Sequence, residues 1–220
     1  LKPEEKDAYF LRGSAELELG DYESAKADFD KAISMDPKNY DRLIEIYEAL
    51  AAHGYREVGQ EYLQNVLDTA KQLDAYDSGR IYYYLGEYQK AYLALDEARD
   101  KGGADSYLYL GRAYAATGDY NYASSVYNNY LSKQGPNAEI YNELGLCEMA
   151  KKEYQNALAA FQAGKQIEGN SLMQTLCFNE IVAYEYLEDY QQAEVLMNAY
   201  LQNYPDDQTA IREQQFLSTR

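Results

Sequence analysis

A short pattern returns along this chain at a nearly constant spacing. It consists of a small or polar residue, an acidic residue, Tyr, two further residues and Ala, as in Gly20-Asp21-Tyr22-x-x-Ala25. The tyrosines of the successive copies are Tyr22, Tyr55, Tyr88, Tyr120, Tyr154 and Tyr190, and the copy at His53-Gly54-Tyr55 is degenerate. Their spacings are 33, 33, 32, 34 and 36. A period of this length is the signature of a repeat architecture, so we expect a stack of similar units.

Within one unit the apolar spacing predicts two helices. In the fourth unit, four residues that are apolar, aromatic or small are spaced at i, i+3, i+4 and i+7, which places them on one face of a helix. These residues are Tyr107, Leu110, Gly111 and Tyr114. Gly118 can end that helix in the left-handed conformation, and the Asp119 carboxylate can cap the next one. Gly111 and Ala123 lack bulk where the two helices would cross, which favours close packing.

The residues at the repeated positions match those of a known family. The first unit carries Tyr9, Gly13, Ala25, Phe29, Ala32 and Pro37, and the fifth carries Tyr141, Leu144, Gly145, Ala157 and Phe161. This arrangement resembles the tetratricopeptide repeat. The resemblance implies an all-α fold, a right-handed superhelical solenoid of antiparallel helix pairs in one domain, 1–220. The repeats fall near 6–39, 40–71, 72–103, 104–137, 138–173 and 174–206, and 207–220 are expected to form a C-terminal capping helix.

The second repeat departs most from the family pattern, because it lacks the Tyr-x-x-Ala pair in register. Starting it at Asn39 would bury Arg42 and Glu45, so we place its start at Tyr40. The residues then expected to face inward are Leu43, Ile46, Tyr47, Leu50, Gly59, Leu63 and Val66.

The resemblance also implies that the first helix of each pair lines a concave groove that binds a partner. Mapping the family's groove positions onto this chain gives Phe10, Ile44, Tyr76, Arg80, Tyr83, Tyr84, Leu108, Arg112, Asn142, Leu146, Met149 and Phe178. The predicted floor is apolar and aromatic, with an acidic rim, and Tyr and Arg are frequent binding hot spots.

Two arginines of this groove, Arg80 and Arg112, lie one repeat apart. They could hold a carboxylate or a phosphate through forked hydrogen bonds. The alternative, which we favour, is that they pair with Glu48, Asp105 or other acids of the groove. The Lys and Asn clamp of the chaperone-binding subgroup is absent, since its positions hold Phe10, Ser14, Glu45, Leu73 and Asp77.

Charge and composition exclude several classes of function. Asp and Glu number 37 against 20 Lys and Arg, giving a net charge of −17. Such a polyanion is a poor ligand for nucleic acid or for an anionic membrane, and no apolar run is long enough to span a bilayer. One His and two Cys are too few for a usual zinc site. We therefore expect no metal and no cofactor.

Catalysis has little support in the residues. The sole imidazole, His53, falls at a turn, and no Ser or Cys nucleophile is paired with it in sequence. Cys147 and Cys177 occupy positions expected to be buried, where they act as small hydrophobes. We expect a protein that is not an enzyme.

Three functions remain, and we favour the first. It is a non-catalytic scaffold whose groove binds a peptide or helical segment of a partner protein with basic flanks. The second is a module that stacks a glycan or cell-wall ligand on bare Tyr faces, and the third is a structural subunit of a larger assembly. Because the chain opens at Leu1 rather than Met, we hypothesise a bacterial lipoprotein or secreted protein acting outside the cytoplasm, with a cytoplasmic protein as the alternative.

Overall fold

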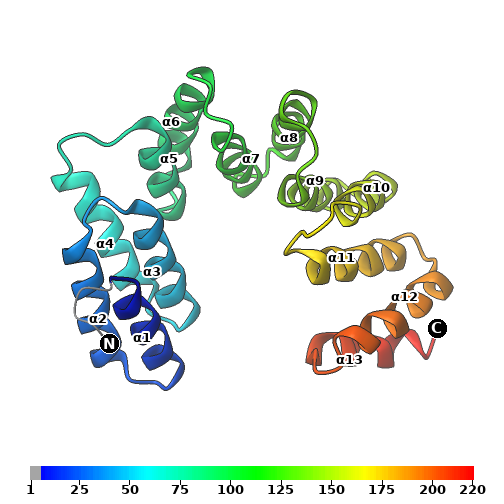
Figure 1. The fold of residues 1–220 in the computed structure, drawn as a ribbon. Coiled ribbons are helices and arrows are strands. Elements are labelled where there is room, and N and C mark those ends of the chain that lie inside the picture. Colours follow the sequence, from blue (N-terminus) through cyan, green and yellow to red (C-terminus); the bar gives the residue numbers. More distant parts are fainter. Residues whose placement is uncertain (1–5) are drawn as a thin grey trace. The chain divides into compact units, whose positions relative to one another are not determined.

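The computed structural model describes residues 6–220, which form thirteen α-helices and no strand (Figure 1). The all-α class expected from the sequence is therefore confirmed. The helices are α1 (Lys6–Glu18), α2 (Tyr22–Met35), α3 (Tyr40–Ala52), α4 (Arg56–Thr69), α5 (Ala75–Tyr84), α6 (Tyr88–Asp100), α7 (Ser106–Ala116), α8 (Tyr120–Gln134), α9 (Ala138–Ala150), α10 (Tyr154–Lys165), α11 (Met173–Tyr186), α12 (Tyr190–Asn203) and α13 (Gln208–Leu217). Within these residues, no helix combines the length and the hydropathy that crossing a bilayer requires.

The turns between paired helices follow the chemistry of the repeated motif. Gly118 has a φ of 84°, and the Asp119 side chain accepts a hydrogen bond from the backbone N–H of Tyr122 at 3.0 Å. This geometry ends α7 and begins α8. Lys152 and Glu188 stand where other copies have Gly, and they adopt the same left-handed conformation with φ of 65° and 60°. The turn is therefore kept even where its best residue is missing, at some cost in backbone strain.

The chain divides into two compact units, Leu1–Glu97 and Ala98–Arg220, which we describe separately. In the first unit, Phe29, Ile46 and Leu50 are fully buried in one cluster. A second cluster joins α3, α4 and α5. It contains Leu43, Ile44, Tyr47, Leu63 and Ile81. The inward-facing residues expected for a second repeat starting at Tyr40 are buried, apart from Val66, which is half-buried.

The second unit, α7 to α13, is built in the same way. One cluster links α7 to α10 around Tyr127 and Leu144, and another links α11 to α13 around Ile181 and Met197. The expected C-terminal helix is α13: Asp207 caps its first turn, and Leu217 packs into the last cluster.

In several helix pairs a glycine of the first helix packs against a bulky side chain of the second. A Cβ atom added at Gly111 would lie 2.3 Å from the Tyr127 ring, and one added at Gly145 would lie 2.3 Å from the Phe161 ring. The sequence suggests that Gly111 and Ala123 make room for a close backbone approach. The structure shows that the space at Gly111 is filled by the aromatic ring instead.

Candidate functional site

In the first unit, Arg80 is 6% exposed and lies beneath the expected groove surface. Its guanidinium donates to Asp41 and Asp77, each at 2.5 Å, and lies 4.4 Å from the centre of the Tyr76 ring. Burial alone would lower the pKa of Arg80, but the hydrogen bonds to the two carboxylates outweigh it and raise the pKa. Arg80 is thus a positive charge already neutralised by the chain itself.

The same arrangement occurs one helix pair earlier. Arg42 donates to Asp7 at 2.8 Å and lies 4.0 Å from the centre of the Phe10 ring. In both cases the arginine lies on the first helix of one repeat, and it binds an aspartate in the first turn of the first helix of the preceding repeat. Arg42 binds Asp7, and Arg80 binds Asp41. These ion pairs connect α1 to α3 and α3 to α5, so they hold neighbouring repeats together.

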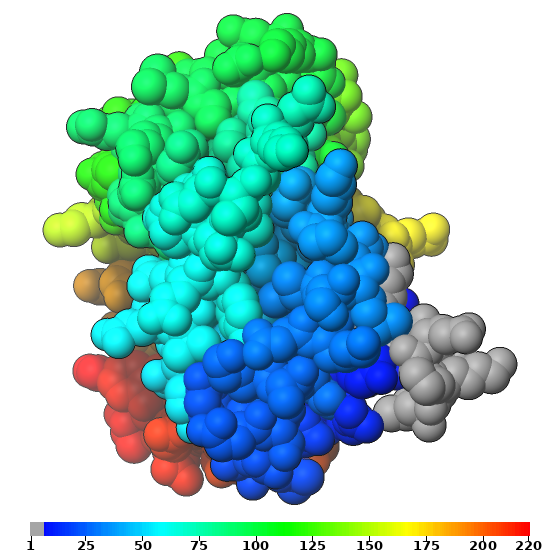
Figure 2. Space-filling model, turned by 90° about the vertical axis from the view of Figure 1, so that its left-hand side faces the viewer, coloured from blue at the N-terminus to red at the C-terminus, as the bar shows by residue number. Residues whose placement is uncertain are grey.

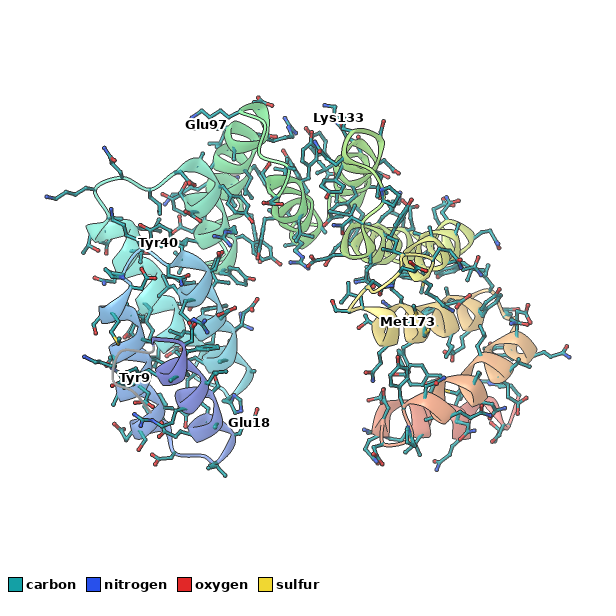
Figure 3. All side chains as sticks on the ribbon, in the orientation of Figure 1. Tyr9, Glu18, Tyr40, Glu97, Lys133 and Met173 are labelled. Atoms are coloured by element: carbon teal, nitrogen blue, oxygen red, sulfur yellow. The ribbon has the colours of Figure 1, made fainter. Side chains whose placement is uncertain are left out.

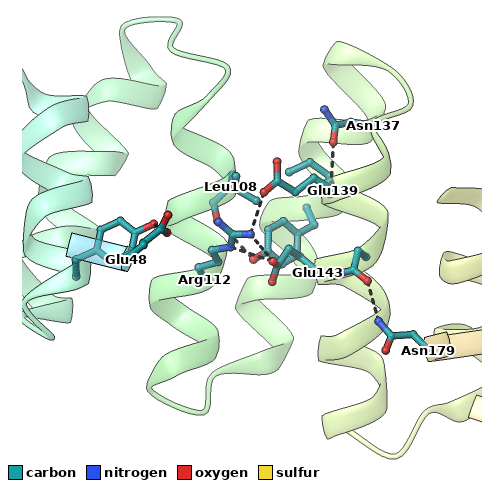
Figure 4. A network of polar contacts seen from close by, with 11 residues as sticks. Glu48, Leu108, Arg112, Asn137, Glu139, Glu143 and Asn179 are labelled. Carbon is teal, nitrogen blue, oxygen red and sulfur yellow. Dashed lines mark hydrogen bonds and ion pairs between the residues drawn. The ribbon is translucent and has the colours of Figure 1, made fainter. Parts of the chain in front are cut away.

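In the second unit, Arg112 donates to Glu143 at 2.7 Å and 2.9 Å and to Glu139 at 3.0 Å (Figure 4). Burial alone would lower the pKa of Arg112, but the negative charge of Glu143 and its hydrogen bonds outweigh burial and raise the pKa. Both groove arginines are therefore paired with carboxylates of their own unit. The acids concerned are neighbours of the groove, and they are neither Glu48 nor Asp105.

The remaining expected groove residues differ in how much surface they present. Ile44 and Asn142 are buried, and the side-chain Oδ1 of Asn142 accepts a hydrogen bond from the side-chain amide of Asn179 at 2.9 Å. Leu146 is 43% exposed. The others are half-buried; they are Phe10, Tyr76, Tyr83, Tyr84, Leu108, Arg112, Met149 and Phe178. Of the expected groove residues, Leu146 therefore has the largest exposed fraction.

The first unit brings Tyr83 and Tyr84 together around a cavity of about 370 Å³. We call it the tyrosine pocket. It is lined by Tyr47, Glu48, Ala51, Arg56, Gln60, Tyr83, Tyr84, Leu85, Gly86 and Tyr88. These residues come from the C-terminal parts of α3 and α5 and from the starts of α4 and α6. Two adjacent repeats therefore build it jointly.

Polar contacts orient the walls of the tyrosine pocket. The Tyr84 hydroxyl donates to the Glu48 carboxylate at 2.5 Å, and the Arg56 guanidinium donates to the Tyr47 hydroxyl at 3.0 Å. The ring of Tyr84 lies 5.1 Å from that of Tyr47 and 5.2 Å from that of Tyr83, centre to centre. The pocket thus offers aromatic walls with one carboxylate and one guanidinium at its edge.

Sequence reasoning misses part of this pocket. It places Tyr47 in the core, which this residue does join, and it does not single out Arg56. The available signal is the cluster of aromatic residues at the ends of two consecutive first helices. Only their packing shows that these ends enclose a cavity with Arg56.

In the described residues, no cluster of three or more His, Cys, Asp or Glu side chains could hold a metal ion. His53 lies at the turn after α3, where its Nδ1 is 2.9 Å from the Ala49 carbonyl oxygen. Cys147 is buried, as expected, which raises the pKa of its thiol to about 12. Cys177, also expected to be buried, is only half-buried.

Family models described as tetratricopeptide repeat match residues 6–39, 76–123 and 110–170, which together exceed half of the chain. This chain belongs to the tetratricopeptide repeat family. The fold is accordingly the all-α superhelix of helix pairs, a typical scaffold for protein interaction. The matched ranges omit residues 40–75, which contain the divergent second repeat and supply half of the tyrosine pocket.

Solved structures agree on the fold. The chain is similar to PilW, a type IV pilus biogenesis factor, with 17% identity, a TM-score of 0.66 and coverage of 96% of this chain and 97% of PilW. PilF of Pseudomonas aeruginosa gives 19% identity, a TM-score of 0.54 and coverage of 98% and 97%. YrrB, described as having an unusual peptide-binding site, is 18% identical, with a TM-score of 0.56 and coverage of 85% of this chain and 97% of YrrB. A comparison with curated proteins found no significant match.

Proposed function

We propose that this protein is a non-catalytic interaction module that binds an extended or helical segment of a partner protein, anchored in the tyrosine pocket. One observation carries the proposal: two adjacent repeats bring four tyrosines, Glu48 and Arg56 together around a cavity of about 370 Å³. That volume is at the small end of ligand sites, and it suits one or two inserted side chains.

The packing of the rings favours a peptide over a glycan. A glycan stacks on tyrosine faces that lie bare in a row, whereas a peptide side chain inserts between rings. Here Tyr83 is 5.2 Å from Tyr84 and 6.0 Å from Tyr88, so the rings cover part of each other and leave a hollow between them. The YrrB precedent for peptide binding on this fold agrees with this choice.

The charge of the molecule favours a basic partner segment. Glu48 is exposed at the pocket, and the chain as a whole has a net charge of −17. A cationic side chain could lie against the tyrosine rings and pair with Glu48, while the negative field would speed its approach. Arg80 and Arg112 serve the fold in this proposal and take no part in partner recognition.

Selection from a peptide library, followed by fluorescence anisotropy with a selected peptide, tests the proposal. Tyr83→Ala should weaken binding at least about tenfold, as hot-spot truncations do. Ala51→Phe should also abolish binding, because it fills the cavity. Tyr122→Ala removes a 43% exposed tyrosine of the second unit and serves as the matched control.

Melting curves of each variant separate loss of binding from loss of folding. Equal affinity in wild type and in both pocket variants would overturn the proposed site. A glycan array that retains ligands, with no peptide selected, would favour the glycan alternative instead. The location outside the cytoplasm stays a hypothesis, and fractionation of the source cells would test it.

A further inference from the structure

A second and larger cavity lies in the first unit, with a volume of about 560 Å³. We call it the lysine pocket. Its lining comes from the loop between α2 and α3, the first residue of α3, the end of α4 and the connector to α5. These residues are Pro37, Lys38, Tyr40, Val66, Thr69, Ala70, Lys71 and Gln72.

The lysine pocket and the tyrosine pocket are at opposite ends of the α3–α4 hairpin. Tyr40 of the lysine pocket begins α3, whereas Glu48 and Ala51 of the tyrosine pocket lie near the other end of the same helix. In Figure 3, Tyr40 marks the start of α3, and Glu18, whose carboxylate lies 3.5 Å from His53 just after α3, marks the other end of that helix. Figure 2 views the unit from the side on which the α4–α5 connector (cyan) lies. The two cavities are therefore separate sites.

The charge of the lysine pocket is opposite to that of the protein. Its lining contains two lysines and no Asp or Glu, although acids outnumber bases by 37 to 20 in the chain. Within residues 6–220 neither Lys38 nor Lys71 forms an ion pair, whereas Arg42, Arg80 and Arg112 all do. Two unneutralised cations at the edge of one cavity attract an anion.

The rest of the lining supplies apolar surface. Pro37, Tyr40, Val66 and Ala70 give the cavity an apolar wall, and the side-chain amide of Gln72 adds a hydrogen-bond donor. A cavity of this volume, mainly apolar with a few polar groups, is typical of sites for small organic molecules.

We propose that the lysine pocket binds a small organic anion, in which a carboxylate or phosphate pairs with Lys38 and Lys71 and a flat apolar body lies against Tyr40 and Val66. The site does not depend on the function proposed for the tyrosine pocket. Residues 40–75, which the family models do not match, supply most of its lining, as they supply half of the tyrosine pocket.

Three matched probes test the proposal on the full chain: 2-naphthoate, 2-naphthyl phosphate and the neutral 2-naphthamide. Binding is followed by the backbone amide signals in two-dimensional ¹H–¹⁵N NMR spectra. We expect both anions to shift signals of residues 38–40 and 66–72. The ratio of the two anions' affinities then identifies carboxylate or phosphate as the preferred group. The neutral 2-naphthamide should bind at least about fivefold more weakly, because it carries no negative charge.

Two kinds of variant localise the effect. Lys38→Met and Lys71→Met should each weaken the anions about fivefold and leave the amide unchanged, and added salt should reduce the difference. Lys133→Met, at the end of α8 in the second unit (Figure 3), is the matched control and should have no effect. Ala70→Trp should exclude all three probes by filling the cavity, with native melting as the folding check.

Several results would overturn the proposal. Equal affinity for 2-naphthamide and 2-naphthoate would show that the lysines do not select an anion. Signal shifts outside the lysine pocket, or no shift with any probe at concentrations up to about 1 mM, would show that the cavity is not a site for such ligands.

Discussion

Replacing Gly111 by Ala should destabilise the second unit, although alanine is the better helix former. The added Cβ would lie 2.3 Å from two ring carbons of Tyr127 and 2.7 Å from its hydroxyl oxygen, where unstrained carbon contacts need about 3.5–4.0 Å. Tyr127 is fully buried, so its ring has no exposed space into which to move. Overpacking of this kind costs about 1–3 kcal/mol, and we expect the upper half of that range.

The same substitution in a Tyr127→Leu background reverses the expected sign. Without the ring there is no clash, and Ala then stabilises α7 relative to Gly by up to about 1 kcal/mol. Urea unfolding of the wild type, both single variants and the double variant, followed by circular dichroism, gives the coupling free energy. A cost for Gly111→Ala that is the same in both backgrounds would refute the contact with Tyr127 as its cause.

Three further predictions concern the backbone, pH and thiol reactivity. Lys152→Gly should raise the free energy of unfolding by about 0.5–1 kcal/mol, because it removes the strain of a non-glycine residue with a φ of 65°. Gly118→Lys should lower the free energy of unfolding for the same reason. Thermal melting of the two variants checks both signs. Burial raises the pKa of Glu185 from 4.5 to about 7, so the native state holds the extra proton and its stability should fall as the pH rises from about 4.5 to 7. Glu185→Gln should remove this fall, so that the variant is more stable than wild type by about 1–2 kcal/mol at pH 8, after allowance for partial exposure, and differs little from it at pH 4. Stability curves against pH that are the same for wild type and variant would contradict this prediction. A thiol reagent such as Ellman's reagent should label Cys177 of the native protein before Cys147, whose pKa is raised to about 12 by burial, and equal labelling rates would contradict the placement of Cys147 in the core.

Much of the fold was predictable because its determinants are local and periodic. The acid-Tyr-x-x-Ala motif marks every hairpin turn except that of the divergent second repeat, and a glycine in the first helix marks the helix crossing, as for Gly111 against Tyr127. Even in the divergent repeat, the need to keep Arg42 and Glu45 out of the core was enough to place the first helix at Tyr40.

The candidate sites were less predictable, because they depend on contacts between residues far apart in sequence. The sequence showed that Arg80 and Arg112 lie among acids. Asp77 is within reach of Arg80 on the same helix, but only the packing of neighbouring helices selects Asp41, Glu139 and Glu143 as further partners.

The sequence by itself determined the repeat, the helix pairs and the family, since helix periodicity, capping and glycine spacing all follow from residue identity at short range. The tertiary structure decided where the surface is hollow. Both pockets form where helix ends and connectors of two repeats meet, and the shape of such a junction depends on how the helices cross. That crossing is set by the fit of many buried side chains at once, which no single spacing in the sequence encodes.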